Sequence, residues 1–554
     1  MSDYRRFYRQ RSVAPILILF SLFALPVALT IQSGLWEEGA FTIDRVASTF
    51  TDSYTRRILF FTLNQALFST LASLLLGLPG AYILATYSFR GKKLIKTLVT
   101  IPFVLPSILV VLGFVIFFGN NGSLNTVLMK VFALEEPPLK ILYSYGAIIL
   151  AHTFFNFPII MSIVSTAWEE LDTNLEAAAA TLGSSKNKVF RTITFPRLLP
   201  AIVTSATLVF LFCFNSFAII LVLGGGPQFT TLEVEIYRQV RMMGNPSGAS
   251  ALAIASMLIN GILFLVYSMS QRKLTISEST NPRVFEIRRP SPITKFFIIL
   301  YTFFTTLFLL GPIASVLIRS FSKTISRSAA PTLSFTWYRQ LLGLEASSSH
   351  MSSGLSALIN STLIALAVSI LTVTLALLLS VSIARRKKNS SFLELFGMMP
   401  MMTSSVIIGL GYVLIARYVR LSLLGSYALI TLAHTVIAFP FALRTILPKV
   451  RSLSETYLYA SYTLGSSPRK TFRRIEVPLL RKTLLTAGIF AFALSLGEFN
   501  ATLILSSSQV VTLPIVMYRL IGSYNFQGAC ALGSILILAS GLTFFLGEVA
   551  KGDS

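Results

Sequence analysis

The residues of this chain that could do chemistry inside apolar surroundings are few, and Glu498 is the clearest of them. It is the one acid well inside an apolar run, which extends from Ala487 to Leu505. A carboxylate at that depth costs about 2.5–3.5 kcal/mol on insertion scales, so such a residue usually faces a bundle interior or a water-filled cavity. Two interpretations stay open: a structural or gating hydrogen bond, or a position that faces the path of a cation.

Other kinds of site chemistry are not visible in the sequence. There is no G-x-x-x-x-G-K-[ST] segment, the loop that cradles nucleotide phosphates, so we do not expect this chain itself to hydrolyse ATP. The apolar runs contain no nucleophile or metal cluster, so we expect no enzyme, no metal site and no cofactor bound by this chain. His152 and His434 occupy equivalent positions in AHTFFNFP and AHTVIAFP, which favours a shared packing role over metal ligation.

A polar, basic segment between two apolar runs occurs twice. The first copy, EAAAATLGSSKNKVFRTITFPRLLP, extends from Glu176 to Pro200, and the second, YASYTLGSSPRKTFRRIEVPLL, begins at Tyr459. The matched glycine, phenylalanine and proline positions all differ by 282 residues. The matched pairs are Gly183 with Gly465, Phe190 with Phe472, and Pro196 with Pro478. The chain is therefore two copies of one unit.

The pattern within this segment predicts its local structure. The alanine-rich part before Leu182 favours a helix, and Gly183 is typical of a C-cap followed by a turn. A second short helix is predicted from Lys186 to Phe195, and Pro196 is expected to mark the start of the next apolar helix.

Composition places the two units in a membrane. The chain has 554 residues, of which 54% are hydrophobic and only 12% are charged. The net charge of +24 comes from short basic clusters beside apolar runs, which is the positive-inside pattern and does not indicate nucleic acid as a partner. Cys213 and Cys530 lie in or beside apolar runs, so no disulfide framework is expected.

Apolar runs of the length needed to cross a bilayer define the topology. We expect an all-α polytopic membrane protein with about 12 transmembrane helices, as two parallel six-helix repeats. The predicted units are a first half at 1–270, a cytoplasmic linker at 271–291 and a second half at 292–554. Both termini are expected in the cytoplasm, and residues 119–141 and 224–237 outside. The predicted spans are 14–31, 59–87, 97–118, 142–167, 198–223, 249–270, 293–318, 357–384, 392–416, 423–446, 482–505 and 526–548.

The duplicated segment resembles the characteristic loop of binding-protein-dependent ABC importer permeases, which is Glu-Ala-Ala, three residues, Gly and a hydrophobic ending before a proline. The resemblance implies an ATP-driven importer in the bacterial inner membrane, among whose lipids it would lie. It implies two copies of a cytoplasmic ATPase, which uses the ATP, and a periplasmic or lipid-anchored solute-binding protein. In that family the loop is a coupling helix that docks into the ATPase. The implied coupling residues are Glu176, Ala177, Ala178, Gly183, Phe190, Pro196, Tyr459, Ala460, Gly465, Phe472 and Pro478.

The sequence departs from this pattern at the family glutamate. The family spacing places that residue at Ala177 and Tyr459, with Glu176 one position early. One residue turns a helix face by about 100°. A salt bridge from this position to the ATPase is therefore in doubt in the first loop and absent in the second.

Further segments resemble the fused two-half permeases of thiamine and ferric-iron importers, and the thiamine branch most. They are CFNSFAIILVLGGGPQFTTLEVEIY, LSLGEFNATLIL and TLPIVMYRLIGSY. With one carboxylate among aromatic residues, the fifth-span pair favours thiamine, a cation with two aromatic rings, over ferric iron. The expected path residues are Asn215, Phe217, Glu498 and Asn500. A ferric-iron permease and, in a different class, an ion-gradient-driven secondary transporter remain as alternatives.

Overall fold

The structure is a computed structural model of the whole chain. It describes residues 13–552, apart from 38, 100–104, 172–173, 227, 277–288, 324–331, 347–348, 386–389, 420–425 and 507–509. Within these residues, 11 helices are long and apolar enough to cross a membrane, or 12 if the bent pair Ser390–Met402 and Ser405–Tyr418 counts as one span. The predicted all-α fold with about 12 spans is thereby confirmed.

The first half is built almost entirely from helices. In chain order its elements are α2 (Val13–Leu19), η1 (Phe20–Ala24), α3 (Leu25–Leu35), β1 (Trp36–Glu37), β2 (Ala40–Phe41), α4 (Asp44–Thr51), α5 (Ser53–Thr86), α6 (Lys92–Leu98), α7 (Ser107–Phe118), α8 (Ser123–Phe132), α9 (Tyr145–Glu169), α10 (Asn174–Thr181), α11 (Lys186–Val189), η3 (Phe190–Thr194), α12 (Phe195–Phe214), α13 (Ala218–Leu223), α14 (Leu232–Arg241) and α15 (Pro246–Ile276).

The second half repeats this order. Its elements are α16 (Pro292–Ser320), β3 (Ser322–Lys323), β4 (Thr332–Leu333), α17 (Thr336–Leu341), α18 (Ser349–Ser352), α19 (Gly354–Ala384), α20 (Ser390–Met398), η4 (Met399–Met402), α21 (Ser405–Tyr418), α22 (Tyr427–Ser452), α23 (Glu455–Thr463), α24 (Pro468–Thr471), η5 (Phe472–Glu476), α25 (Val477–Leu496), α26 (Asn500–Leu505), α27 (Leu513–Gly522) and α28 (Phe526–Gly552). Each half also holds one two-stranded antiparallel hairpin, β1–β2 and β3–β4.

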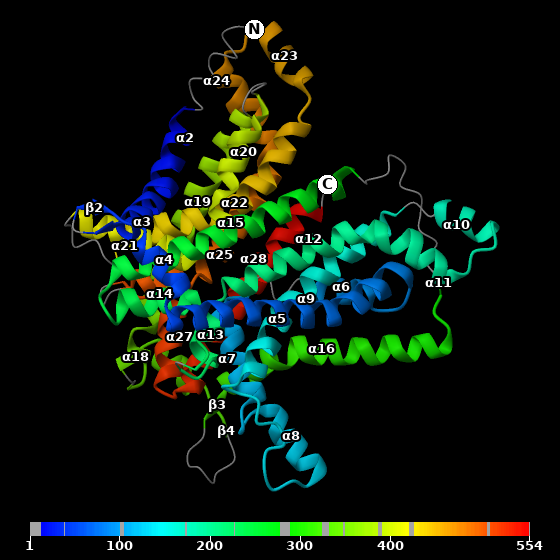
Figure 1. The fold of residues 1–554 in the computed structure, drawn as a ribbon, viewed down its shortest axis with the longest axis vertical. Coiled ribbons are helices and arrows are strands. Elements are labelled where there is room, and N and C mark those ends of the chain that lie inside the picture. The colour runs from blue at the N-terminus through cyan, green and yellow to red at the C-terminus, as the bar shows by residue number, and fades with distance from the viewer. Residues whose placement is uncertain are drawn as a thin grey trace.

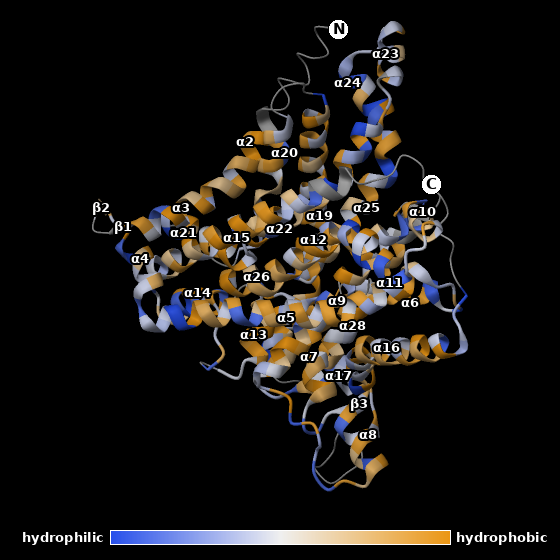
Figure 2. Cartoon of the chain, turned by 45° about the vertical axis from the view of Figure 1, so that its right-hand side comes forward, coloured by the Kyte–Doolittle hydropathy of each residue, from blue (hydrophilic) through white to orange (hydrophobic). Residues whose placement is uncertain are grey.

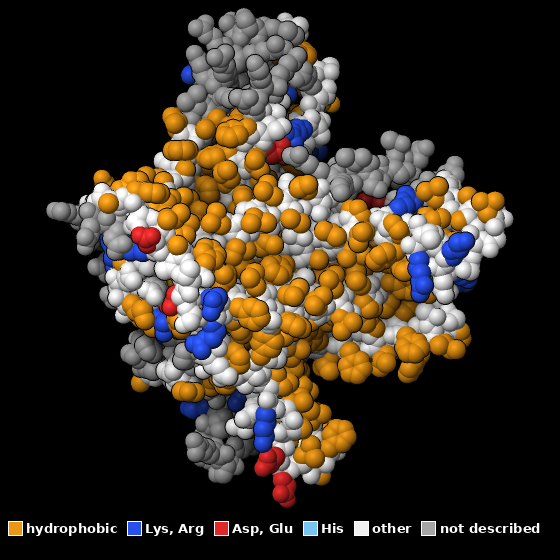
Figure 3. Space-filling model, in the orientation of Figure 1, with side chains coloured by type: hydrophobic (Ala, Val, Ile, Leu, Met, Phe, Trp, Pro, Cys, Tyr) orange, Lys and Arg blue, Asp and Glu red, His pale blue; other side chains and the backbone are white. Residues whose placement is uncertain are grey.

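The two halves splay apart from a common centre. Figure 1 shows the spans of the first half, such as α5 and α9, lying across the view, whereas α20 and α22 of the second half stand upright. The two copies of the duplicated segment lie apart, with α23–α24 at the top of the view and α10–α11 at its right-hand edge. Hydrophobic residues dominate the spans and hydrophilic ones gather near the tips (Figure 2), and apolar side chains cover most of the face seen in Figure 3.

The first span of each half packs against the other half. Helix α3 contacts α21 of the second half, and α16 contacts α7 of the first half. Both contacts use a proline against a glycine. A Cβ added at Gly411 of α21 would lie 2.6 Å from Pro26 Cβ, and one added at Gly113 of α7 would lie 3.1 Å from Pro312 Cβ. Gly113 and Gly411 are repeat equivalents, so the exchange of first spans is symmetric.

Equivalent hydrogen bonds confirm that the repeat extends into the core. The Tyr145 hydroxyl donates to Asn64 Oδ1 at 2.5 Å, and the Tyr427 hydroxyl donates to Asn360 Oδ1 at 2.7 Å. His152 and His434 are both buried. The Nδ1 atom of each shares a hydrogen bond with a serine, but the two serines are not repeat equivalents, since Ser69 at 3.0 Å is in α5 and Ser495 at 2.9 Å is in α25. These contacts fit the predicted packing role.

Several predicted boundaries are wrong. The fifth spans, 198–223 and 482–505, are each interrupted, after Phe214 and after Leu496. The third span of the second half bends by 94° between η4 and α21. Residues 119–141 contain α8, and α14 replaces the expected loop after residue 231. Hydropathy alone does not show such breaks, because the residues on both sides of each break are equally apolar.

The helix start predicted at Pro196 agrees with α12, which begins at Phe195, but the predicted separation from the preceding short helix is not observed. Residues Lys186–Phe214 form one continuous helix, as do Pro468–Leu496 in the second half. In both, a π-helical turn, η3 or η5, comes directly before the proline-containing turn. This wider turn accommodates a residue that has no backbone N–H to donate.

Two further expectations rest partly on residues that the structure does not describe. The N-terminal basic cluster lies within residues 1–12, and the linker includes residues 277–288, both outside the described part. Helix α15 continues beyond residue 270 to Ile276. The orientation of the termini and the limits of the halves stay predictions.

The close approach of α3 to α21 predicts a sharp response to one added methyl group. Gly411→Ala should lower the unfolding temperature in detergent, since overpacking typically costs about 1–3 kcal/mol and the opposing atoms include the Pro26 backbone. Gly541→Ala is the matched control, because its Cβ would meet nothing within 4 Å and the residue also lies inside a helix. An unchanged unfolding temperature for Gly411→Ala would contradict this packing.

Candidate functional site

The turn in each duplicated segment has the same backbone geometry. Gly183 has φ +78° and Gly465 has φ +77°, a conformation that favours glycine. After α10, the Ser184 N–H donates to the Ala179 carbonyl at 3.0 Å, and after α23 the Ser466 N–H donates to the Ser461 carbonyl at 2.9 Å. This is the Schellman C-cap. The predicted C-cap at Gly183 is therefore confirmed, and its repeat at Gly465 has the same form.

An exposed leucine precedes each of these glycines. Leu182 and Leu464 are equivalent positions, and each is 87% exposed. A large apolar side chain at the tip of a protruding turn, repeated in both halves, is a feature that a partner surface would cover. The sequence analysis did not single these leucines out. The signal was present in the shared TLGSS pentapeptide.

The predicted coupling residues differ in how they are placed. Ala177, Ala178, Tyr459 and Ala460 are exposed, as are Pro196 and Pro478. Glu176 is not free to reach outward, because its Oε1 accepts a hydrogen bond from Thr194 Oγ1 at 2.6 Å. Phe190 is half exposed and stacks on Trp168, with 6.1 Å between ring centroids, and Phe472 packs at the edge of the second-half core.

A second candidate site lies where the two interrupted helices meet. The break after α12 comprises Asn215–Phe217, and the break after α25 comprises Gly497–Phe499, at an offset of 282. The rings of Phe217 and Phe499, one from each half, lie 6.0 Å apart. Two residues in equivalent positions that contact each other must lie close to the approximate two-fold axis that relates the halves.

Two tyrosines extend this aromatic pair. Tyr237 of α14 packs on Phe217, and Tyr518 of α27 packs on Phe499, both with ring centroids 5.4 Å apart. We call these four residues the aromatic plug. It fills the space between the halves just beyond the two breaks. Phe217, one of the expected path residues, is buried against Phe499.

Glu498 caps the N-terminus of α26, the helix that follows it. Its Oε1 accepts the Ala501 N–H at 2.9 Å and its Oε2 accepts the Asn500 N–H at 3.1 Å. The break frees backbone donors in a medium without water, and a carboxylate satisfies two of them at once. This contact supports the structural interpretation of Glu498.

The same residue also lines a cavity of about 230 Å³. Polar groups come from Ser107, Ser405, Glu498 and Asn500. Asn500 Nδ2 donates to Ser405 Oγ at 3.1 Å, whereas Asn500 Oδ1 is buried and accepts no hydrogen bond from the described residues. The two interpretations of Glu498 are therefore compatible, because one carboxylate both caps a helix and faces the cavity.

The cavity extends from the break toward the coupling end of the second half. It is lined by Phe490, Ala493 and Leu494, which share one face of α25 at helical spacing, and by Gly497 directly after this helix. Residues Leu105 to Ser107 of the first half form part of the opposite wall. The predicted path residue Asn215 does not line this cavity. It exchanges hydrogen bonds with Asn260 of α15 at 2.8 and 3.1 Å.

The sequence analysis missed a second buried acid, Glu233 of α14. Its Oε1 accepts from Ser256 Oγ at 3.1 Å, and its Oε2 accepts from Ser404 Oγ, in the second half, at 2.5 Å. Glu233 lies within residues 224–237, for which the sequence predicts a position outside the membrane, whereas the structure buries this side chain in α14. Glu233 and Glu498 therefore lie on either side of the start of α21, and neither forms an ion pair with a described residue.

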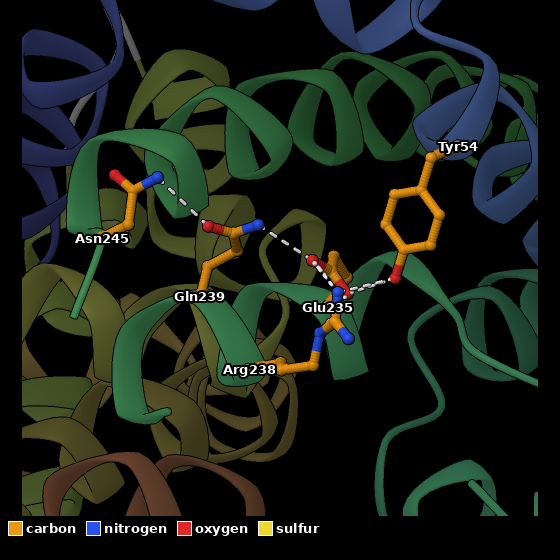
Figure 4. Close-up of polar contacts among 5 residues, drawn as sticks. All are labelled: Tyr54, Glu235, Arg238, Gln239 and Asn245. Carbon is orange, nitrogen blue, oxygen red and sulfur yellow. Dashed lines mark hydrogen bonds and ion pairs between the residues drawn. The ribbon is translucent and has the colours of Figure 1, made fainter. Parts of the chain in front are cut away.

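The negative charge of the other acid of α14, Glu235, is compensated by an ion pair. Glu235 forms an ion pair with Arg238 at 2.9 Å, accepts from the Tyr54 hydroxyl at 3.1 Å and accepts from Gln239 at 2.9 Å (Figure 4). Gln239 in turn accepts from Asn245 before α15. The network holds α14 against the first turn of α5, which places Glu233 and Tyr237 at the interface between the halves.

Known proteins resemble the chain through both halves. The model of the family described as "Binding-protein-dependent transport system inner membrane component" matches residues 75–276 and 373–549. A thiamine transport system permease protein of Haemophilus influenzae is 28% identical over 501 residues, 89% of this chain and 88% of its own length. That of Escherichia coli is 28% identical over 536 residues, with 95% and 94% covered.

A relative of a different kind matches half of the chain. A putative 2-aminoethylphosphonate transport system permease protein of Salmonella typhimurium is 30% identical over 257 residues, which cover 46% of this chain and 90% of its own length. Such a relative corresponds to one of the two units. Since the family model matches more than half of the chain, once in each half, the chain belongs to the binding-protein-dependent transport system inner membrane components, as a fusion of two such units.

Proposed function

We propose that this permease imports thiamine, driven by ATP that a partner ATPase hydrolyses. The observation that carries the proposal is the similarity of the whole chain, in both halves, to permeases named for thiamine transport. A solute-binding protein would deliver the substrate from outside, periplasmic or lipid-anchored. Two copies of the cytoplasmic ATPase would dock on the two coupling loops, and this chain would bind no cofactor of its own.

The chemistry of the cavity supports an organic cation as substrate. Glu498 supplies one carboxylate, and Ser107, Ser405 and Asn500 supply hydroxyl and amide groups. The ring of Phe490 lines the same cavity. A desolvated cation over an aromatic face gains up to about 2 kcal/mol. Phe490 takes the aromatic role that the sequence had assigned to Phe217.

The ferric-iron alternative has less support. A hard cation prefers several oxygen ligands at once. The described residues hold no group of three or more His, Cys, Asp or Glu side chains that could bind a metal ion. Glu233 does not change this balance, because the Ser256 and Ser404 hydroxyls occupy its two oxygens. Membership of a binding-protein-dependent family argues against the other alternative, an ion-gradient-driven secondary transporter.

The arrangement suggests the direction of opening. The cavity follows α25 back toward the coupling end, whereas the aromatic plug closes the space beyond Glu498. We infer a state that is open to the cytoplasm and closed to the outside. Alternating access would then require Phe217 and Phe499 to separate when the coupling loops approach each other.

Transport assays test the proposal directly. The permease, its ATPase and its binding protein would be reconstituted in vesicles without an ion gradient, and ATP-dependent uptake of labelled thiamine would be measured. Uptake is the expected result. Stimulation of ATP hydrolysis by an iron-loaded binding protein, with none by thiamine, would favour the ferric-iron alternative instead.

Glu498→Gln should weaken thiamine-stimulated ATP hydrolysis by about 10- to 150-fold, because a charge-assisted contact to the substrate is worth about 1.5–3 kcal/mol. Gln retains one acceptor and leaves either the Asn500 or the Ala501 N–H unpaired, so the unfolding temperature should fall, but by less than when both acceptors are removed. Glu498→Ala removes both acceptors and should lower that temperature as well. Full stimulation in Glu498→Gln would contradict a role in the path.

Leu182→Ser and Leu464→Ser should each reduce co-purification of the ATPase with the permease. These side chains are 87% exposed, so their replacement removes little packing within the chain and should leave its unfolding temperature unchanged. Leu175→Ser, at an exposed position of α10, whose last residue Thr181 precedes Leu182, is the control, because it lies at the other end of this helix from the turn. Normal ATPase binding by the double variant would exclude the two leucines from docking.

A further inference from the structure

An ion pair occupies the same place in both halves with its charges exchanged. In the first half, Lys96 Nζ lies 2.9 Å from Glu169 Oε1 and 3.0 Å from its Oε2, and Lys92 adds a contact at 3.3 Å. In the second half, Arg451 Nη2 lies 2.6 Å from Glu394 Oε2. The basic residue of the pair is thus on the short helix α6 in the first half and on the long helix α22 in the second half.

Sequence positions show that these pairs are equivalent. Glu169 and Arg451 differ by 282, the offset that relates the coupling loops. Lys96 and Glu394 differ by 298, the offset that relates the helix starts at Ser107 and Ser405. At both positions of the ion pair, the charge in one half is therefore opposite to the charge in the other half, yet the two side chains still attract each other. The attraction between the two helices, rather than either residue type, is the property that both halves share.

Each pair lies at the foot of a coupling loop. Glu169 is the last residue of α9, and α10 begins at Asn174. Arg451 is next to the last residue of α22, and α23 begins at Glu455. The pair thus holds a second helix, α6 or α20, to the point where a membrane span passes into the loop proposed to dock the ATPase.

The second helix leads to the cavity. In the second half, α20 continues through η4 to Ser404 and Ser405 at the start of α21. Ser404 donates to Glu233 of the first half, and Ser405 accepts from Asn500 and lines the cavity beside Glu498. A displacement of α20 would therefore reach both buried acids.

We propose that these ion pairs are positioning contacts that make α6 and α20 follow the coupling loops, so that movement of the ATPase is delivered to the cavity. The proposal rests on the proposed function of the loops. Stability alone does not account for the pairs, because all members are at least partly exposed and such pairs add little to folding. A contact that transmits movement needs only to keep two helices together.

The second half offers the cleaner test, since the ion pair found there among the described residues joins only Arg451 and Glu394. Arg451→Glu and Glu394→Lys each create a like-charge pair, and the double variant recreates the arrangement of the first half. Lys449→Glu is the matched control, because it makes the same charge change on an exposed residue of the same helix. Assembly with the ATPase, basal ATP hydrolysis, and hydrolysis stimulated by loaded binding protein would be measured for each.

Both single variants should assemble and retain basal hydrolysis, but lose about 2- to 30-fold of the stimulated rate, the range for residues that carry coupling. The double variant and Lys449→Glu should return to near the unsubstituted rate. Single variants that are stimulated normally, or a double variant as impaired as the singles, would overturn the proposal.

A readout independent of the substrate separates this proposal from the proposed function. Cysteine placed at Ala493, on the cavity wall, would be labelled with and without an ATP analogue, against the low background of the buried Cys213 and Cys530. The labelling should respond to the analogue in the unsubstituted protein and in the double charge variant, but not in the singles. If the labelling responds as expected in all variants but thiamine is not taken up, the choice of thiamine as substrate is wrong and the proposal for the ion pairs stands.

Discussion

A membrane has no water to satisfy backbone groups that a broken helix sets free, and this constraint shapes the centre of the protein. The second-half break is stable because the Glu498 carboxylate accepts two freed N–H groups. The first-half break has Ser216 at the equivalent position, and Asn215 there bonds to Asn260 and to the Leu211 carbonyl. The two breaks therefore differ in their polar contacts, and only the second-half break places a carboxylate beside the cavity.

That asymmetry explains how a duplicated chain can carry a single path. The aromatic plug is symmetric, since Phe217 and Phe499 come from equivalent positions and both carry a flanking tyrosine. The polar groups beside it are not symmetric, because Glu498 has no acidic counterpart and Glu233 of the first half corresponds to a proline-containing turn of the second. The proposed opening movement thus involves the symmetric aromatic plug, whereas the proposed contact with the substrate comes from the asymmetric Glu498.

Much of the fold could be predicted from the sequence, because hydropathy and an internal repeat can be recognised without knowledge of tertiary contacts. The spans, the two coupling turns and the depth of Glu498 all followed from local pattern. Glu233 could not be found in that way, since its burial depends on Tyr54 and Arg238 holding α14 against α5. The breaks at Asn215 and Gly497 were hidden by apolar neighbours, and the exposure of Leu182 became visible only with the turn geometry.

The exchange of first spans has a consequence for how the chain is made. The Tyr412 hydroxyl donates to the Leu22 carbonyl at 2.8 Å, across 390 positions of sequence. At about 5–20 residues per second, a ribosome needs ~20–80 s to cover that distance. During this time the first helix is already in the bilayer, while the helix that will bury its Pro26 has not been synthesised. The first half therefore cannot complete its fold before nearly half of the second has been translated.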